Sequence, residues 1–105
     1  MAHYLHYYCD IILYSQKTTD IKKYLAELVG TFTLTFLGCA VAVSLNCGSD
    51  TASVVGTALA FGLSVVAMAY TIGGISGCHI NPAISLGVFL SGKMSAKDCG
   101  MFLLV

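Results

Sequence analysis

The sequence predicts an all-α membrane protein with two transmembrane helices, a re-entrant half-helix and the start of a third long helix. Hydrophobic residues make up 57% of the 105 residues and charged residues 10%, against roughly half and a quarter in soluble domains. No Asp, Glu, Lys or Arg occurs from Thr51 to Gly92. A loop closed by Asn81-Pro82 lies inside that stretch. Irregular backbone at membrane depth persists only where protein buries it or where it lines a water-filled cavity.

Residues 1–20 are expected to form an N-terminal extension. Their apolar run is short and is interrupted by Asp10, so it predicts neither a signal peptide nor a spanning helix. Four tyrosines suit a segment at the membrane interface, and a poorly ordered extension is the alternative. His3 and His6 lack a third ligand nearby, so the pair predicts no metal site.

Two long apolar segments predict the spanning helices. The first begins at about Ile21, and its part from Tyr24 to Leu45 carries a single charge, Glu27. That part is about 33 Å long as a helix, enough to cross a hydrocarbon core of about 30 Å. A polar turn, Asn46–Asp50, leads to the second helix, Thr51 to about Gly73.

The re-entrant helix is predicted from Asn81 and Pro82. An Asn side chain accepts the first backbone N–H bonds as an N-cap, and Pro is favoured at the next position. The apolar run that follows ends at about Ser91 and is too short to cross a bilayer, so it should dip in and return. A polar hairpin, 91–98, and a third apolar run from Cys99 come next. That run stops after seven residues, so the sequence looks truncated within an element.

The lysines predict the topology. Lys17, Lys22 and Lys23 precede the first helix, and Lys93 and Lys97 follow the re-entrant helix, whereas the turn between the two long helices has none. Because lysine is enriched in cytoplasmic loops, the N-terminus is expected in the cytoplasm. The protein is thus expected to be integral to a membrane, with the plasma (inner) membrane as the expected location.

Other classes of function find little support in the composition. The net charge is zero and no basic patch suggests nucleic acid. No nucleophile–base pair is recognisable, so we predict no enzyme, no catalytic residue and no cofactor. The five cysteines show no metal-ligand spacing and are interpreted as small residues tolerated in a membrane, with a disulfide or redox role as the alternative: Cys9, Cys39, Cys47, Cys78 and Cys99.

The Asn-Pro loop predicts a path for a small neutral molecule. A helix N-terminus carries about half a positive charge and free N–H groups, and Asn81 adds two amide donors. The segment Gly77–His79, expected to be extended, can offer backbone carbonyls as acceptors. Donors at a positive helix end beside a row of acceptors favour water and disfavour ions and protons.

Three segments resemble the major intrinsic protein (aquaporin) family, in its prokaryotic water-channel form. They are Ala-Glu-Leu-Val-Gly-Thr-Phe (26–32), Ala-Phe-Gly-Leu (60–63) and Ile-Ser-Gly-Cys-His-Ile-Asn-Pro-Ala (75–83). The resemblance runs from about Lys22 to the end. It implies that residues 21–105 are the first of two inverted repeats of an hourglass fold, and that complete members are homotetramers with one pore per subunit. The implied function is passive, single-file water permeation. A glycerol or small-solute facilitator and a non-conducting truncated fragment are the alternatives.

The resemblance also implies roles for individual residues. Asn81 would be the pore amide donor at the midplane, and Pro82 and Ala83 would hold the half-helix against its counterpart. Gly77, Cys78 and His79 would present carbonyls to the pore.

Phe61 would be the aromatic of the outer constriction, which goes with water rather than glycerol, and Glu27 would be a buried carboxylate that accepts hydrogen bonds from the loop. Each has a simpler alternative. Glu27 sits near the interface and could reach water, Phe61 could be ordinary packing, and His79 could be a loop histidine that holds backbone.

Two departures from the family pattern stand in the loop. Gly74 occupies a position where many members have a bulkier residue, and Cys78 replaces Gly or Ala. A thiol in a water pore would be a site for block by mercurials. The second repeat, with its own Asn-Pro-Ala and constriction residues, is absent from these 105 residues.

Overall fold

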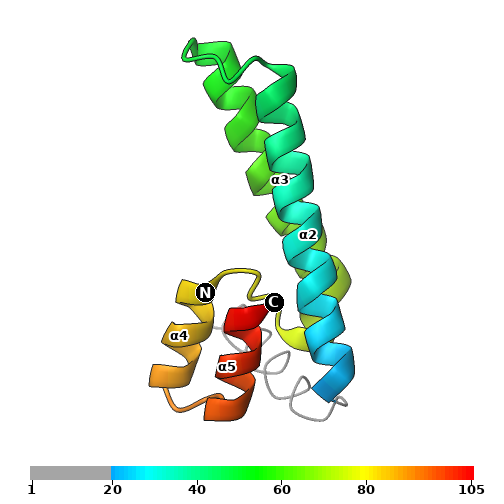
Figure 1. Cartoon of the computed structure of the whole chain (residues 1–105), viewed down its shortest axis with the longest axis vertical. Coiled ribbons are helices and arrows are strands. Elements are labelled where there is room, and N and C mark those ends of the chain that lie inside the picture. Colours follow the sequence, from blue (N-terminus) through cyan, green and yellow to red (C-terminus); the bar gives the residue numbers. More distant parts are fainter. Residues whose placement is uncertain (1–19) are drawn as a thin grey trace, which may run out of the picture.

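The computed structural model describes residues 20–105 and is all-helical in that range (Figure 1). Four helices are present there: α2 (Asp20–Ser44), α3 (Thr51–Ser76), α4 (Pro82–Leu90) and α5 (Ala96–Leu104). The predicted fold class is confirmed. The expectations for the N-terminal extension and for His3 and His6 concern residues 1–19, which lie outside the described part of the chain.

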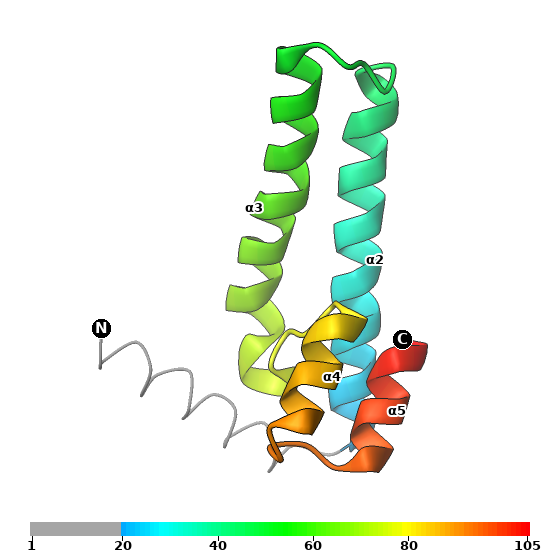
Figure 2. The same ribbon diagram turned by 90° about the vertical axis from the view of Figure 1, so that its left-hand side faces the viewer.

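Helices α2 and α3 form a long antiparallel hairpin, and the short pair α4 and α5 lies beside one end of it (Figures 1 and 2). The long helices have 25 and 26 residues, and both are long and apolar enough to cross a membrane. At the far turn, Asp50 caps α3 by accepting a bond of 3.1 Å from the Ser53 N–H. The two predicted spans are therefore confirmed, with α2 starting at Asp20 rather than Ile21.

The end of α3 differs from the prediction. We expected the helix to stop at about Gly73, but it continues to Ser76, and Gly77 is its C-cap with a left-handed φ of 91°. The Gly77 N–H bonds to the Gly73 carbonyl at 2.9 Å. Only a residue without Cβ adopts that φ at low cost. The expected loop is therefore shorter, because Gly73 and Gly74 stay helical and Gly77 is the residue that ends the helix.

The remaining helices begin at side-chain caps. Asn81 caps α4 and Pro82 is its first residue, as predicted. Helix α5 starts at Ala96, inside the segment predicted to be a polar hairpin. Its cap is Ser95, whose Oγ accepts from the Asp98 N–H at 3.1 Å and donates to the Asp98 carboxylate at 2.9 Å. The polar residues near 95–98 therefore form the first turn of a helix.

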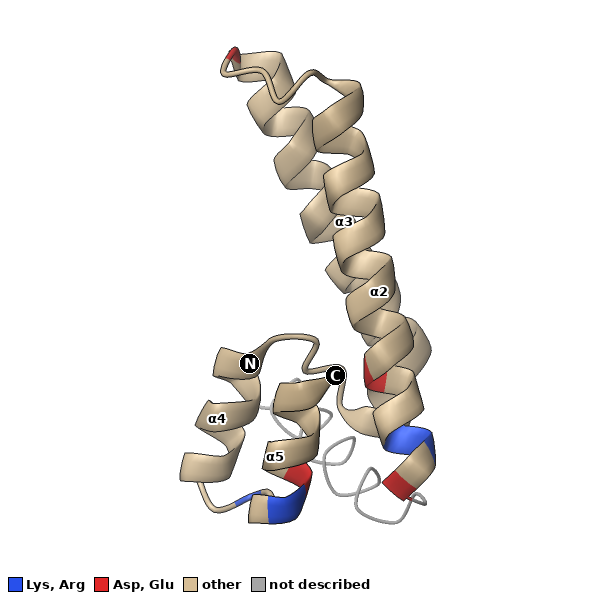
Figure 3. Cartoon of the chain, viewed as in Figure 1, with Lys and Arg blue, Asp and Glu red and all other residues tan. Residues whose placement is uncertain are grey.

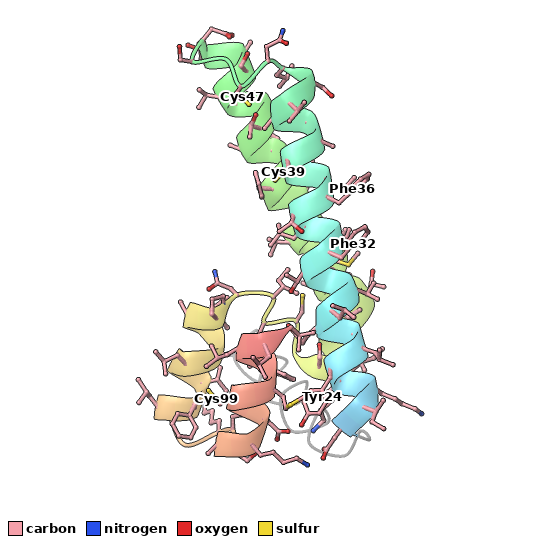
Figure 4. All side chains as sticks on the ribbon, viewed as in Figure 1. Tyr24, Phe32, Phe36, Cys39, Cys47 and Cys99 are labelled. Carbon is pink, nitrogen blue, oxygen red and sulfur yellow. The ribbon has the colours of Figure 1, made fainter. Side chains whose placement is uncertain are left out.

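The described helices bury few apolar side chains against one another. Ala26, Ile72 and Ile80 form a small core cluster at the end of the hairpin that meets α4 and α5. Phe32 and Phe36 stack on the outer face of α2 and are 64% and 59% exposed (Figure 4). So large an apolar surface suits lipid or further protein rather than water.

Candidate functional site

The site is built around the Glu27 carboxylate, which is 2% exposed. Its Oε1 accepts bonds from the Ser76 hydroxyl at 2.5 Å and from the His79 N–H at 2.9 Å. Its Oε2 accepts from the Ile80 N–H at 2.6 Å. One side chain of α2 thus holds the end of α3 and the two loop residues before Asn81. The alternative that Glu27 reaches water at the interface is wrong.

Ser76 extends this anchor. Its hydroxyl donates to Glu27 and accepts from the Cys78 N–H at 3.2 Å. The backbone amides of residues 78, 79 and 80 are therefore all bonded by two side chains. Buried amides need such partners, because each one left without a bond costs about 1–3 kcal/mol.

The segment Gly77–His79 was predicted to be extended, and this prediction is wrong for Gly77 and Cys78. Besides Gly77, the non-glycine residues Cys78 and Ile80 have left-handed φ values of 51° and 38°. A positive φ is a real outlier for a β-branched residue and persists only where its surroundings fix it. Here the Ile80 amide is bonded to Glu27, and its side chain packs into the core cluster with Ile72. Among residues 20–105, no hydrogen-bond donor reaches the carbonyls of Gly77, Cys78 or His79. All three remain available as acceptors.

Asn81 ends the loop and begins α4. Its Oδ1 accepts from the Ala83 N–H at 2.8 Å, so its side-chain amide hydrogens stay available within the described chain. Asn81, Pro82 and Ala83 are all exposed. Figure 2 shows the loop rising from the end of α3 along the hairpin, with α4 running back toward the level at which α2 begins. This is the re-entrant path that the sequence predicted.

His79 is the buried side chain of the loop, 7% exposed. Its Nδ1 lies 3.0 Å from the Ser85 hydroxyl, and its ring meets Phe102 of α5 edge to face, with centroids 5.0 Å apart. Ser85 is 1% exposed and its Oγ lies 3.4 Å from the Asn81 carbonyl. His79 therefore joins the loop to both short helices.

Phe61 lies apart from these residues. It sits fifteen residues before Ser76 on α3, about 23 Å along the helix axis. Its ring packs against Gly38 of α2, where an added Cβ would lie 2.3 Å from the ring. Phe61 is half-buried, and its distance along α3 from Ser76 places it at a different level of the hairpin from the anchored end of the loop.

Sequence reasoning missed three residues of this site. Ser76, Ser85 and Phe102 join the loop to three helices. Ser85 and Phe102 occur in apolar runs that are typical of plain membrane helix, whereas Ser76 was placed in the loop segment 75–83 without a role of its own. A serine four residues after a predicted N-cap asparagine, as at position 85, was the one available signal.

Within residues 20–105, no group of three or more His, Cys, Asp or Glu side chains could hold a metal ion.

Comparison with known proteins gives a consistent result. The family model described as Major intrinsic protein matches residues 14–105. Aquaporin Z of Rhodopseudomonas palustris is 51% identical over 87 residues, which are 81% of this chain and 36% of that protein. Aquaporin Z of Bradyrhizobium diazoefficiens is 54% identical over 79 residues, 73% of this chain and 32% of that protein.

A shorter relative is Aquaporin Z of Flavobacterium johnsoniae. It is 50% identical over 80 residues, 74% of this chain and 100% of that sequence. The chain spans about a third of the length of the Rhodopseudomonas and Bradyrhizobium relatives.

Proposed function

This chain belongs to the major intrinsic protein family, and from that premise we propose that it forms one half of a passive membrane channel for water. It is an integral membrane protein with two apolar helices of spanning length. The observation that carries the proposal is the anchoring of the loop by Glu27. All loop amides from 78 to 80 are bonded on one side, which leaves the carbonyls of Gly77, Cys78 and His79 for a permeant.

Asn81 is proposed as the donor that faces this row of acceptors. Its amide hydrogens and the N-terminal end of α4 offer hydrogen bonds and positive potential at one point of the path. A single file of water can accept bonds there and donate to the carbonyls. Cations and protons are disfavoured by the same positive potential. Pro82 and Ala83, both exposed, are proposed to pack against the matching half-helix of a second repeat.

We propose Phe61 as the aromatic of the outer constriction, at a level of the hairpin away from Asn81. A phenyl ring there favours water over glycerol.

Cys78, half-buried in the loop, is proposed as the site at which mercurials block the channel. We propose a homotetramer for the complete channel. No step of passive permeation calls for a catalytic residue or a cofactor.

The charges support an orientation. Figure 3 shows the lysines of the described helices at the end of the molecule that holds α4 and α5. Asp50, the N-cap of α3, belongs to the turn at the opposite end of the hairpin. We propose that the lysine end is cytoplasmic, in the plasma (inner) membrane, because basic residues favour that side.

A chimera tests the proposal. Residues 20–105 replace the matching segment of the Rhodopseudomonas Aquaporin Z, and proteoliposomes are shrunk osmotically in a stopped-flow instrument. The chimera should raise water permeability well above empty vesicles and to within a few fold of the unmodified relative. Glu27→Ala in the chimera should remove most of the gain, while Cys47→Ser, in the far turn, should not.

Two results would contradict the proposal. One is a chimera that inserts and assembles like the relative but leaves water permeability at the level of empty vesicles. The other is swelling in a glycerol gradient that matches the water response, which would favour the small-solute facilitator. Proteoliposomes of the 105-residue chain alone show separately whether it conducts without a second repeat.

A further inference from the structure

A hydrogen bond between α2 and α5 is not used by the proposed function. The Tyr24 hydroxyl donates to the Asp98 carboxylate at 2.7 Å, between residues 74 positions apart. The other oxygen of this carboxylate accepts from the Ser95 hydroxyl, which fixes the acceptor on the first turn of α5. A bond to an ionised acceptor in a half-buried place is stronger than a neutral one at the surface.

A second contact between the same helices is weaker. Lys97 and Asp20 form a salt bridge of 2.9 Å, but their side chains are 72% and 50% exposed. Exposed pairs of this kind contribute little, because water and salt screen them. The Tyr24–Asp98 bond is therefore the firmer polar tie between α2 and α5.

The same tyrosine also contacts an aromatic side chain that leads to the loop. The rings of Tyr24 and Phe102 meet edge to face, with centroids 5.8 Å apart and planes at 87°. Asp98 and Phe102 lie one turn apart on α5, so they share a face of that helix. Tyr24 bonds to Asp98 and packs against Phe102, which fixes Phe102 relative to α2.

Phe102 in turn confines the ring of His79. The two rings are perpendicular, at 89°, and Phe102 is 8% exposed. The Nδ1 of His79 bonds to Ser85, while its Nε2 lies 3.3 Å from the place of a Cβ on Gly77. The imidazole therefore has Phe102, Ser85 and the Gly77 backbone around it, and its rotation requires Phe102 to move.

We propose that Tyr24 and Asp98 are positioning residues for the pore loop. Acting through Phe102, they keep the His79 ring in the orientation that bonds to Ser85, and so keep the carbonyls beside His79 in register. The consequence for water rests on the proposed function, whereas the effect on the ring does not.

Solid-state NMR of the full chain in lipid bilayers tests this inference. In a His3→Gln/His6→Gln background, His79 is the only histidine, so every imidazole ¹⁵N signal belongs to it. That background should give one set of ring signals. Tyr24→Phe, which removes only the hydroxyl, should give a second or broadened set, and the His79 amide hydrogen should exchange about tenfold faster.

Tyr70→Phe is the matched control, because it removes the same group from an 87% exposed tyrosine on α3. It should leave the ring signals and the His79 exchange unchanged. Asp98→Asn keeps an acceptor oxygen and should change the ring signals less than Asp98→Ala. That ranking separates the loss of the hydrogen bond from a general effect of altering α5.

Three results would overturn the inference. They are identical His79 signals in Tyr24→Phe and the background, the same change in Tyr70→Phe, or faster exchange spread evenly through α3, which would mean loss of the whole fold. If the His79 signals change as expected but the chimera fails to raise water permeability, the result counts against the proposed function alone.

Discussion

The two ends of the α2–α3 hairpin are held together in different ways. Toward the Asp50 turn, the side-chain hydrogen bonds link residues three or four apart, such as Ser64 to the Ala60 carbonyl. At the other end, the side-chain bonds of Glu27 and Tyr24 span 49 to 74 residues. The first region is thus an apolar contact between helices, and the second is a polar network that defines one loop conformation. The difference predicts where substitutions matter.

The largest effect is expected at Glu27. Glu27→Ala leaves the amides of His79 and Ile80 without their acceptor. The Ser76 hydroxyl keeps only the longer bond of 3.4 Å to the Ile72 carbonyl, and the total cost is on the order of 3 kcal/mol in loop stability. Hydrogen exchange of residues 78–80 in bilayers measures it. Glu27→Gln keeps one acceptor oxygen and should lose less. If the amides of residues 78–80 exchange equally fast in Glu27→Ala and in the unmodified chain, the Glu27 bonds do not determine the stability of the loop.

A smaller effect is expected at Gly30 of α2, which faces the apolar cluster of Ile72 and Ile80 beside the polar network. A Cβ there would lie 2.6 Å from both Ile72 Cδ1 and Ile80 Cγ2. Gly30→Ala should therefore cost about 1–3 kcal/mol, seen as a lower thermal midpoint in detergent. Gly62→Ala is the control, since a Cβ there meets nothing within 4 Å. An unchanged midpoint for Gly30→Ala would show that Ile80 is free to shift.

The cap at the far turn should respond to acid. The Ser53 bonds hold the pKa of the Asp50 carboxyl below its usual range. A lowered folded-state pKa means that the cap contributes stability above the ordinary carboxyl pKa, and that this contribution is lost as the pH falls through the lowered value, below about pH 4. The Ser53 amide should then exchange faster. An Asn side chain caps a helix without titrating, so in Asp50→Asn the exchange of the Ser53 amide should not change over the same pH range. If it becomes faster there as well, protonation of Asp50 is not the cause.

The smallest effect is expected at Thr71, whose hydroxyl bonds the Ala67 carbonyl at 2.7 Å. That carbonyl belongs to the regular helix, and the side chain is exposed. Thr71→Val should change stability by no more than about 0.5 kcal/mol, measured by the same thermal midpoint. A loss as large as that of Gly30→Ala would contradict the contrast between the two kinds of contact.

The same contrast decides how much could be predicted from sequence. Features fixed by neighbours in the chain, such as the Asn81-Pro82 helix start and the two spans, follow from local rules. The end of α3 could not be predicted by local rules. The glycines at 73, 74 and 77 are equal candidates for the end of the helix, and only Gly77 has the left-handed φ. The α5 start was missed although Ser95 and Asp98 have the spacing of a cap.

Contacts between distant segments were beyond local rules. The Glu27 contact was expected only through the family resemblance, because the residues around Glu27 in the sequence do not indicate that its carboxylate bonds to Ile80. The His79 contacts with Ser85 and Phe102 depend on how α4 and α5 pack, and apolar periodicity does not specify that packing. The roles of these residues in permeation remain proposals.

The reach of the Glu27 contacts has a consequence for biosynthesis. Its partners follow it by 49 to 53 residues, and at roughly 5–20 residues per second the ribosome needs several seconds to make them. For that interval α2 exists with a carboxylate that has none of its final donors. Insertion of the first helix and completion of the loop are therefore separate events in time, and the second can begin only after α3 has been made.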